Sequence, residues 1–260
     1  MPATIEADEP DRKADDREPA MITFMSMKGG AGKTIGLMAL ASTLVSRGNR
    51  VAIFEADESE PITEWERHGK DKQTWTDEIL IYPVRSIEDL DYSHNLAAQA
   101  GADYILVDTK GGGSDINQTL ILNSQLVIVP SGLDVTEMQA LFKTCAYLIE
   151  LSEDSDDEIP VVILLNRTPT RDSKLPVTHR LGLKALTDSN MPVLTSRLPD
   201  RQVLADIASG GILQKYYEYC RTRMDRRLMA TEVLKAIKDA ETLTDEVLQV
   251  MLPETEAVEA

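Results

Sequence analysis

Short apolar runs alternate with longer amphipathic stretches along most of the chain. Each run is rich in β-branched residues and is bounded by polar residues or glycine, which predicts a strand buried on both faces. An Ala- and Leu-rich stretch at residues 33–46, and one at 135–151 with apolar residues three and four positions apart, predict helices. We therefore predict one doubly wound α/β domain, a single, mostly parallel sheet flanked by helices. The predicted strands are residues 21–26, 51–57, 78–84, 104–108, 125–130 and 160–166.

The remainder of the chain, after residue 199, shows helical patterns. A helix is predicted at residues 201–208, broken by Gly210 and Gly211. A longer one is predicted at residues 213–240, and the pattern extends towards Pro253, where the helix should fray.

Composition narrows the class of protein. The 260 residues are 42% hydrophobic, which excludes a wholly disordered or fibrous chain. Cys145 and Cys220 stand far apart without metal-ligand spacing, so neither a disulfide framework nor a zinc or iron–sulfur site is expected. No apolar run approaches the roughly 20 residues that span a bilayer, and the acidic start is unlike a signal peptide. We expect a cytoplasmic protein.

Charge is segregated along the chain. The formal net charge is −17, and the acids concentrate in residues 1–20, 150–158 and 241–260. We predict a disordered acidic arm at 1–20, an acidic surface loop at 153–158 and an acidic C-terminal tail at 241–260. Residues 160–240 instead hold 14 Lys and Arg against 8 Asp and Glu, a balance of +6. These residues, 160–240, are part of the predicted folded domain at 21–240, and they are the candidate for contact with an anionic partner.

The sequence MKGGAGKT, residues 27–34, follows a predicted strand and opens a predicted helix. Glycines there let backbone N–H groups surround phosphates at a helix N-terminus, with Lys33 reaching the β- and γ-phosphates and Thr34 ligating Mg²⁺. A chance Gly-rich turn is the alternative. Met27 replaces the usual first glycine, and the added Lys28 is either a solvated lysine or neutralises phosphate across a dimer interface. The predicted nucleotide-binding residues of this loop are Gly29, Gly30, Ala31, Gly32, Lys33 and Thr34.

With its KGGxGK[ST] motif, the chain resembles the ParA/MinD superfamily of deviant Walker-A ATPases over roughly residues 21–213. The resemblance implies a P-loop ATPase domain at residues 21–240 that hydrolyses ATP slowly, with Mg²⁺ as cofactor. It also implies an ATP-bound sandwich homodimer in which Lys28 contacts the partner subunit's nucleotide. Lys28, Lys33 and Asp57 are accordingly predicted as catalytic residues.

Two carboxylates and one amide extend the predicted site. Asp57 ends the second strand, where the family's aspartate orients the attacking water, although Glu55 replaces that motif's first aspartate. Asp108 ends the strand YILVD and is the predicted Mg²⁺ ligand beside Thr34. Lys110 departs from the family's usual second switch. By resemblance, Asn166, Pro199 and Asp200 are predicted to contact the nucleotide base.

Within the superfamily, the chain is most similar to VirC-type ATPases of T-DNA and conjugative transfer, at residues 54–66, 103–119 and 165–170. That subgroup is implied to bind DNA near a transfer origin and to recruit relaxase–DNA complexes to the cell pole. An acidic C-terminus is unlike the basic amphipathic helix that binds lipid, so no membrane contact is expected. The predicted DNA contacts are Arg167, Arg171, Arg180, Arg221, Arg223, Arg226 and Arg227.

The leading interpretation is a dimerising ATPase that binds DNA nonspecifically, associates with the nucleoid, and positions or segregates a cargo such as a plasmid, a transfer complex or a protein assembly. A stimulating partner protein belongs to this interpretation. The alternatives are a MinD-like or metabolic P-loop ATPase that does not bind DNA, and an interaction protein with an inactive nucleotide site.

Overall fold

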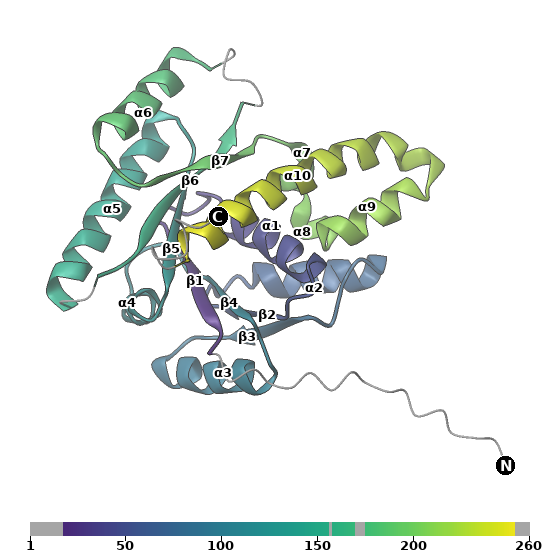
Figure 1. Cartoon of the computed structure of the whole chain (residues 1–260), viewed down its shortest axis with the longest axis horizontal. Helices are drawn as coiled ribbons and strands as arrows, with labels where there is room; N and C mark the ends of the chain where they lie inside the picture. Colours follow the sequence, from purple (N-terminus) through teal and green to yellow (C-terminus); the bar gives the residue numbers. More distant parts are fainter. Residues whose placement is uncertain (1–17, 156–157, 170–174, 253–260) are drawn as a thin grey trace.

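Seven parallel strands form one sheet in the order β3-β2-β4-β1-β5-β6-β7 (Figure 1). The computed structural model describes residues 18–155, 158–169 and 175–252. The strands are β1 Ala20–Phe24, β2 Val51–Glu55, β3 Ile79–Pro83, β4 Tyr104–Asp108, β5 Leu126–Ser131, β6 Val161–Thr168 and β7 Val193–Pro199. The predicted doubly wound parallel sheet is confirmed. The sequence pattern did not single out β7, because this edge strand alternates buried residues with exposed or half-buried ones such as Thr195 and Arg197.

Helices cover both faces of the sheet (Figure 1). One face packs against α1, α2 and the C-terminal helices α7 to α10, and the other against α3 to α6. Among the described helices, none is long and apolar enough to cross a membrane. The helices are α1 Lys33–Ser46, α2 Pro61–Lys72, α3 Ile87–Gln99, α4 Asp115–Leu122, α5 Val135–Ser155, α6 Val177–Asp188, α7 Gln202–Ala205, α8 Ile207–Gly210, α9 Leu213–Arg221 and α10 Arg227–Val250, with a 3₁₀ turn, η2, at Met224–Arg226.

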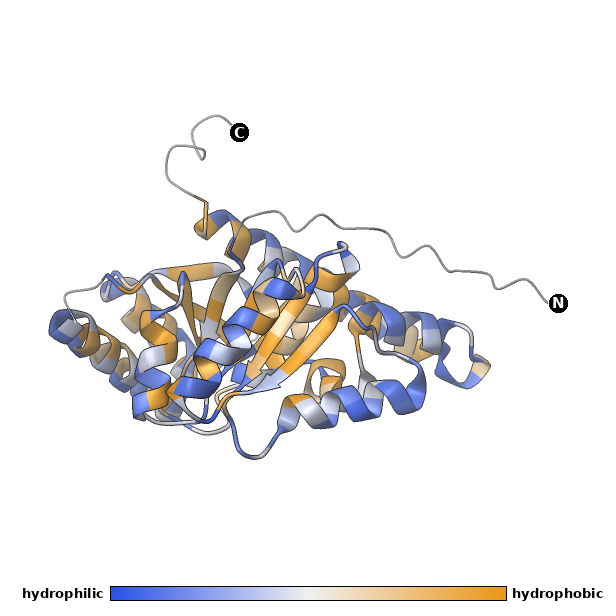
Figure 2. Ribbon diagram, turned by 90° about the horizontal axis from the view of Figure 1, so that it is seen from below, coloured by the Kyte–Doolittle hydropathy of each residue, from blue (hydrophilic) through white to orange (hydrophobic). Residues whose placement is uncertain are grey.

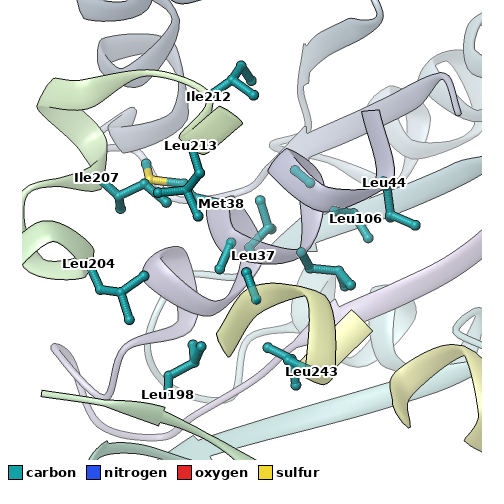
Figure 3. Packing of buried hydrophobic residues seen from close by; sticks show 14 of the residues in the cluster. Leu37, Met38, Leu44, Leu106, Leu198, Leu204, Ile207, Ile212, Leu213 and Leu243 are labelled. Atoms are coloured by element: carbon teal, nitrogen blue, oxygen red, sulfur yellow. The ribbon is translucent and has the colours of Figure 1, made fainter. Parts of the chain in front are cut away.

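Helix α1 lies between the sheet and the C-terminal helices. Ten of its 14 residues are buried, as expected for a helix that is apolar on nearly all sides. Leu37 and Leu44 pack in one cluster with Leu106 of β4 and Leu243 of α10 (Figure 3). Figure 2 shows that the strands are mostly apolar, whereas the helices around them alternate apolar and hydrophilic residues. The helix that begins at the phosphate loop is therefore held from both sides.

The C-terminal helices differ from the sequence prediction. The single helix predicted at residues 213–240 is a pair, α9 and α10, joined through η2. The predicted helix at 201–208 is two short helices, α7 and α8, which meet at Asp206. Helix α5 continues to Ser155, so part of the predicted acidic loop is helical.

The expected domain boundary at residue 240 falls inside α10. Leu243 and Val247 are fully buried in the core, while acids such as Glu241 and Asp245 lie on the exposed side. The apolar periodicity therefore continues past the acids, and residues 241–250 belong to the folded unit. Ala20 likewise belongs to β1. Of the acidic arm predicted at residues 1–20, the first 17 residues lie outside the described residues, as do residues 253–260 at the end of the predicted tail.

Candidate nucleotide-binding site

The phosphate loop leaves the carboxyl end of the central strand β1 and ends at Lys33, the first residue of α1. Gly32 adopts a φ of 97°, and a Cβ on it would lie 2.0 Å from the Asn166 side-chain nitrogen, so only glycine fits there. Within the described chain, no acidic side chain occupies the first turn of α1 and no side chain caps it. Its N–H groups are therefore available to an anion such as phosphate.

Neighbouring elements hold this loop in place. The backbone N–H of Met27 donates to Oγ1 of Thr144 in α5 at 3.0 Å. From β6, Nδ2 of Asn166 donates to the carbonyl of Ala31 at 2.6 Å. Asn166 is 2% exposed, so this bond is shielded from water. The predicted base-contacting asparagine is thus beside the loop, where it positions the backbone.

Asp108 is the buried carboxyl group of the site. It ends β4 beside β1, is fully buried, and accepts through Oδ2 a 2.9 Å hydrogen bond from Thr34 Oγ1. Its other oxygen, Oδ1, is buried without a hydrogen-bond partner in the described structure. Burial raises the pKa of Asp108 to about 7, although the Thr34 bond and the Lys33 charge favour ionisation. A hydroxyl beside an unpartnered carboxyl oxygen is a donor set that suits Mg²⁺.

Asp57 lies beyond β2 and is half-buried. It accepts hydrogen bonds from the N–H and Oγ of Ser59 at 2.9 and 2.7 Å. Burial raises the pKa of Asp57, but these bonds and the charges of Lys33 and Lys110 outweigh it and hold the pKa below its ordinary value. The two carboxyl groups near Lys33 are therefore in different states: Asp57 is ionised, whereas Asp108 titrates near neutrality.

Glu55 has a role that the sequence analysis did not find. Its carboxylate is 1% exposed and accepts bonds from the N–H of Ile62 at 2.6 Å and from Oγ1 of Thr63 at 2.6 Å. The N-cap residue of α2, Glu60, makes no side-chain cap, and Glu55 satisfies the first turn instead. The departure from the family's aspartate thus ties β2 to α2. The available signal was a Pro at the start of α2 that directly follows Glu60, a poor capping residue, rather than Ser, Thr or Asp.

Glu137 is the second residue that the sequence analysis missed. It lies in the first turn of α5 with its side chain 7% exposed, and it accepts a 2.6 Å bond from the N–H of Gly132. Two cations share its Oε1: the Lys28 ammonium at 3.4 Å and the Arg167 guanidinium. Lys28 is therefore paired in its own subunit rather than simply solvated. The predicted DNA contact Arg167 is directed here as well.

Residues 109–113, the predicted second switch, lie against the phosphate loop. The N–H of Gly112 donates to the carbonyl of Ser26 at 3.4 Å. Asn117, 1% exposed at the start of α4, donates to the carbonyls of Lys110 and Gly112 at 2.9 and 2.6 Å. Lys110, unexplained by the family pattern, pairs with Glu58 at 3.0 Å. A carbonyl-binding asparagine of this kind gives no signal in the sequence.

The remaining residues, predicted to contact the base or DNA, lie in separate parts of the structure. Pro199 ends β7 in register with Thr168 of β6, and the N–H of Asp200 donates to the Thr168 carbonyl at 2.8 Å, so this loop adjoins the Asn166 strand end. Arg180 lies on α6, which packs on one face of the sheet. The four arginines at residues 221–227 lie where α9 joins α10, and these two helices pack on the opposite face. One subunit does not bring these two sets together. Arg171 lies outside the described residues.

Comparison with known proteins identifies the family. The family model described as VirC1 protein matches residues 20–253. The virC1 protein of Rhizobium rhizogenes is 33% identical over 226 residues, covering 86% of this chain and 95% of that protein.

Two solved structures share the fold. They are MinD of Pyrococcus horikoshii in complex with Mg-ADP (TM-score 0.59, 15% identity, 90% and 99% of the two chains) and a plasmid partition protein of Borrelia burgdorferi (TM-score 0.57, 16% identity, 90% and 99%). At such low identity these two show the fold alone. The family match runs from β1 to beyond α10, and the chain therefore belongs to the VirC1 family, with the ParA/MinD fold.

Proposed function

We propose that this protein is a ParA-type ATPase switch: ATP joins two copies, the dimer binds DNA, and hydrolysis separates them. One observation carries the proposal. The loop holds a buried lysine, Lys33, close to Asp57 and Asp108. It also holds a second lysine, Lys28, although Lys33 is enough to neutralise the phosphates of a nucleotide bound in the same subunit. A surplus cation in a phosphate-binding loop suits a second nucleotide, brought by a partner subunit.

Each residue of the site has a task in binding. The N–H groups of the loop and of the first α1 turn hold the phosphates, and Lys33 neutralises the β- and γ-phosphates. The oxygens of Thr34 and Asp108 are 2.9 Å apart, at the place where Mg²⁺ would be bound through oxygen ligands. Mg-ATP, when bound, supplies the phosphoanhydride bond whose cleavage resets the switch.

Asp57 is the proposed residue for orienting water. It stays ionised, so it can accept a hydrogen bond from a water molecule aimed at the γ-phosphate. Its present partner is Ser59, only two residues away, and a local contact of this kind can be exchanged without unfolding β2. Lys33 lies close enough to lower the Asp57 pKa, which couples the two residues.

Dimerisation would require Lys28 to leave Glu137. The Lys28 side chain is 37% exposed and its ion pair with Glu137 is 3.4 Å long, so the pair is partly screened by water and costs little to break. Arg167 stays on Glu137 and prevents a buried, unpaired carboxylate. The ammonium can then turn outward to a partner's phosphates.

The DNA-binding part of the proposal depends on the arginines between α9 and α10, which contact phosphate without reading bases. The cargo is a DNA molecule to be segregated or a DNA-transfer complex. Membership of the VirC1 family favours a second, narrower candidate, in which the protein recruits relaxase–DNA complexes for conjugative transfer.

A metabolic ATPase with a cysteine-ligated cluster at a dimer interface is disfavoured. Cys145 and Cys220 are both buried and free. Burial raises the pKa of Cys145 to about 11 and raises that of Cys220 as well, so neither thiol is poised to become the thiolate that a cluster needs.

Calorimetry and light scattering with Mg-ATP test the proposal. We expect the parent to bind ATP and dimerise, Lys33→Ala to lose ATP binding, and Lys28→Ala to keep ATP but remain monomeric. Release of phosphate by the parent, measured over several hours, tests hydrolysis. Unchanged ATP affinity in Lys33→Ala would contradict the site assignment, and a normal Lys28→Ala dimer would contradict the role of the second lysine.

A further inference from the structure

The turn between α9 and α10 exposes apolar side chains that the fold does not use. We call residues 221–229 the hairpin tip. Met224 is 85% exposed and Leu228 is 88% exposed, more than the other exposed large hydrophobic residues that the structure describes, of which the next is Tyr92 at 67%. In Figure 1 this turn is at the outer end of the α9–α10 pair, away from the strands. Exposing both side chains costs solubility, which suggests a binding role.

The same tip is strongly basic. It carries four arginines against one acid, Asp225, a net charge of +3 in a chain of −17. Arg223 and Arg227, which directly precede Met224 and Leu228, have no carboxylate partner among the described residues, and the Arg223 guanidinium is 4.3 Å from the centre of the Tyr219 ring. Each exposed apolar side chain thus follows an arginine whose charge is available to an anionic ligand.

Arginines beside one or two protruding Met or Leu side chains match a known way of binding duplex DNA. Proteins that enter the minor groove hold its edges with arginine and insert an apolar side chain between base pairs, which bends the duplex. Phosphate contact alone would use the arginines and leave both apolar residues in water. The combination therefore favours a ligand that has both an anionic surface and an apolar interior.

We propose that Met224 and Leu228 insert between base pairs of duplex DNA, while Arg223 and Arg227 hold the flanking backbone, so that the protein bends the DNA to which it binds. This deepens the proposed function and rests on its DNA-binding part. An anionic bilayer offers the same chemistry, but it is a wide surface that would also approach parts of the chain beyond the tip, and the whole chain has a net charge of −17 that it would repel. A duplex is narrow enough to contact the tip alone.

The test uses the full chain with Mg-ATP and a short duplex that carries a fluorescence donor and acceptor at its ends. Anisotropy of the labelled duplex reports binding, and energy transfer reports bending. The parent should bend the duplex by about 20–90°. The double variant Met224→Ala/Leu228→Ala should still bind but should lose the change in energy transfer. Because both side chains are exposed, the variant should fold, and a melting curve checks this.

Two controls separate the apolar and basic contributions. Val177→Ala/Leu181→Ala changes another pair of exposed apolar residues, 63% and 62% exposed and four positions apart on α6, and should bend DNA like the parent. Arg223→Gln/Arg227→Gln should weaken binding and lower the slope of log K against log salt by about two, since each phosphate contact contributes about 0.9.

The remaining outcomes are decisive. Equal bending by the parent and the Met224→Ala/Leu228→Ala variant overturns this inference, and so does a parent that binds DNA without bending it; the proposed function stands in both cases. A parent that does not bind DNA with ATP at low salt refutes the DNA-binding part of the proposed function and this inference with it. Flotation of the parent, but not of the variant, with phosphatidylglycerol vesicles overturns the inference in favour of lipid insertion.

Discussion

Asp108 offers a quantitative test of the site before any ligand is added. The carboxyl group is fully buried, one of its oxygens has no hydrogen-bond partner in the described structure, and its pKa is raised by burial from 3.8 to about 7. This difference of about three pH units corresponds to about 4 kcal/mol of unfavourable free energy for the ionised form in the folded state. Asp108→Asn keeps the shape and removes the charge.

The direction in which the free energy of unfolding changes with pH follows from proton binding by Asp108. Between about pH 4 and pH 7 the folded protein keeps the Asp108 proton while the unfolded chain has lost it, so the group's contribution to stability falls by about 1.4 kcal/mol per pH unit. Below that window both states are protonated, and above it the loss is complete. The free energy of unfolding of Asp108→Asn, minus that of the parent, should therefore rise through the window and level off above pH 7 about 4 kcal/mol higher.

Urea unfolding of the nucleotide- and metal-free proteins, between about pH 5 and pH 8, measures this difference. Groups that do not interact with Asp108 titrate alike in the two proteins and cancel. A difference that stays constant with pH would refute the argument that Asp108 is a buried, proton-binding carboxyl.

The same ionisation should make Mg-nucleotide affinity of the parent rise up to about pH 7, since the metal needs the carboxylate. Subtracting the Asp108→Asn profile removes titration of the nucleotide phosphates.

Three further predictions concern the supporting contacts. Gly32→Ala should lower both ATP affinity and the free energy of unfolding, because its Cβ would lie 2.0 Å from the β6 asparagine. Gly48→Ala has a similar φ, but its Cβ would meet no atom within 4 Å, so it should cost only the backbone strain of about 1–2 kcal/mol; equal melting shifts would contradict this. Glu55→Gln should lower the free energy of unfolding by about 1–3 kcal/mol in urea, as charge-assisted bonds to α2 are lost, and an unchanged midpoint would exclude that role. Glu137→Gln should release Lys28 and so tighten the ATP-bound dimer, measured by sedimentation. Breaking the Lys28–Glu137 ion pair costs about 0.5–1 kcal/mol in each of the two subunits, so its removal should lower the dimer dissociation constant about 5- to 30-fold; a weaker dimer would disprove the pairing.

The fold could be predicted from the sequence wherever a local pattern carried the information. Buried strands such as β1 and β4 are continuous apolar runs, and the KGGAGK loop joins a strand to a helix within one short segment. The edge strand β7 was missed because its alternating pattern is weaker than a continuous apolar run. The end of α10 was misplaced because acidic residues on its exposed side hid the buried Leu243 and Val247.

The contacts that support the site could not be predicted, because they join residues far apart in the chain. Glu137 is 109 residues from Lys28, and Asn166 is 135 residues from the Ala31 carbonyl to which it donates. In the sequence, Glu55 is only a departure from a family motif, whereas the fold places its carboxylate at the first turn of α2, where it accepts a backbone hydrogen bond. The loop's residue types predict phosphate chemistry, but only the packing shows what holds each side chain before a ligand arrives.

The most direct test of the switch is a titration of duplex DNA with the protein in ATP, in ADP and without nucleotide, each at two salt concentrations. The account predicts that DNA is retained in ATP alone, and that the affinity falls steeply with salt, by about 0.9 in log K per log unit of salt for each phosphate contact. Equal retention of DNA in all three nucleotide states, or no retention in any of them, would contradict it.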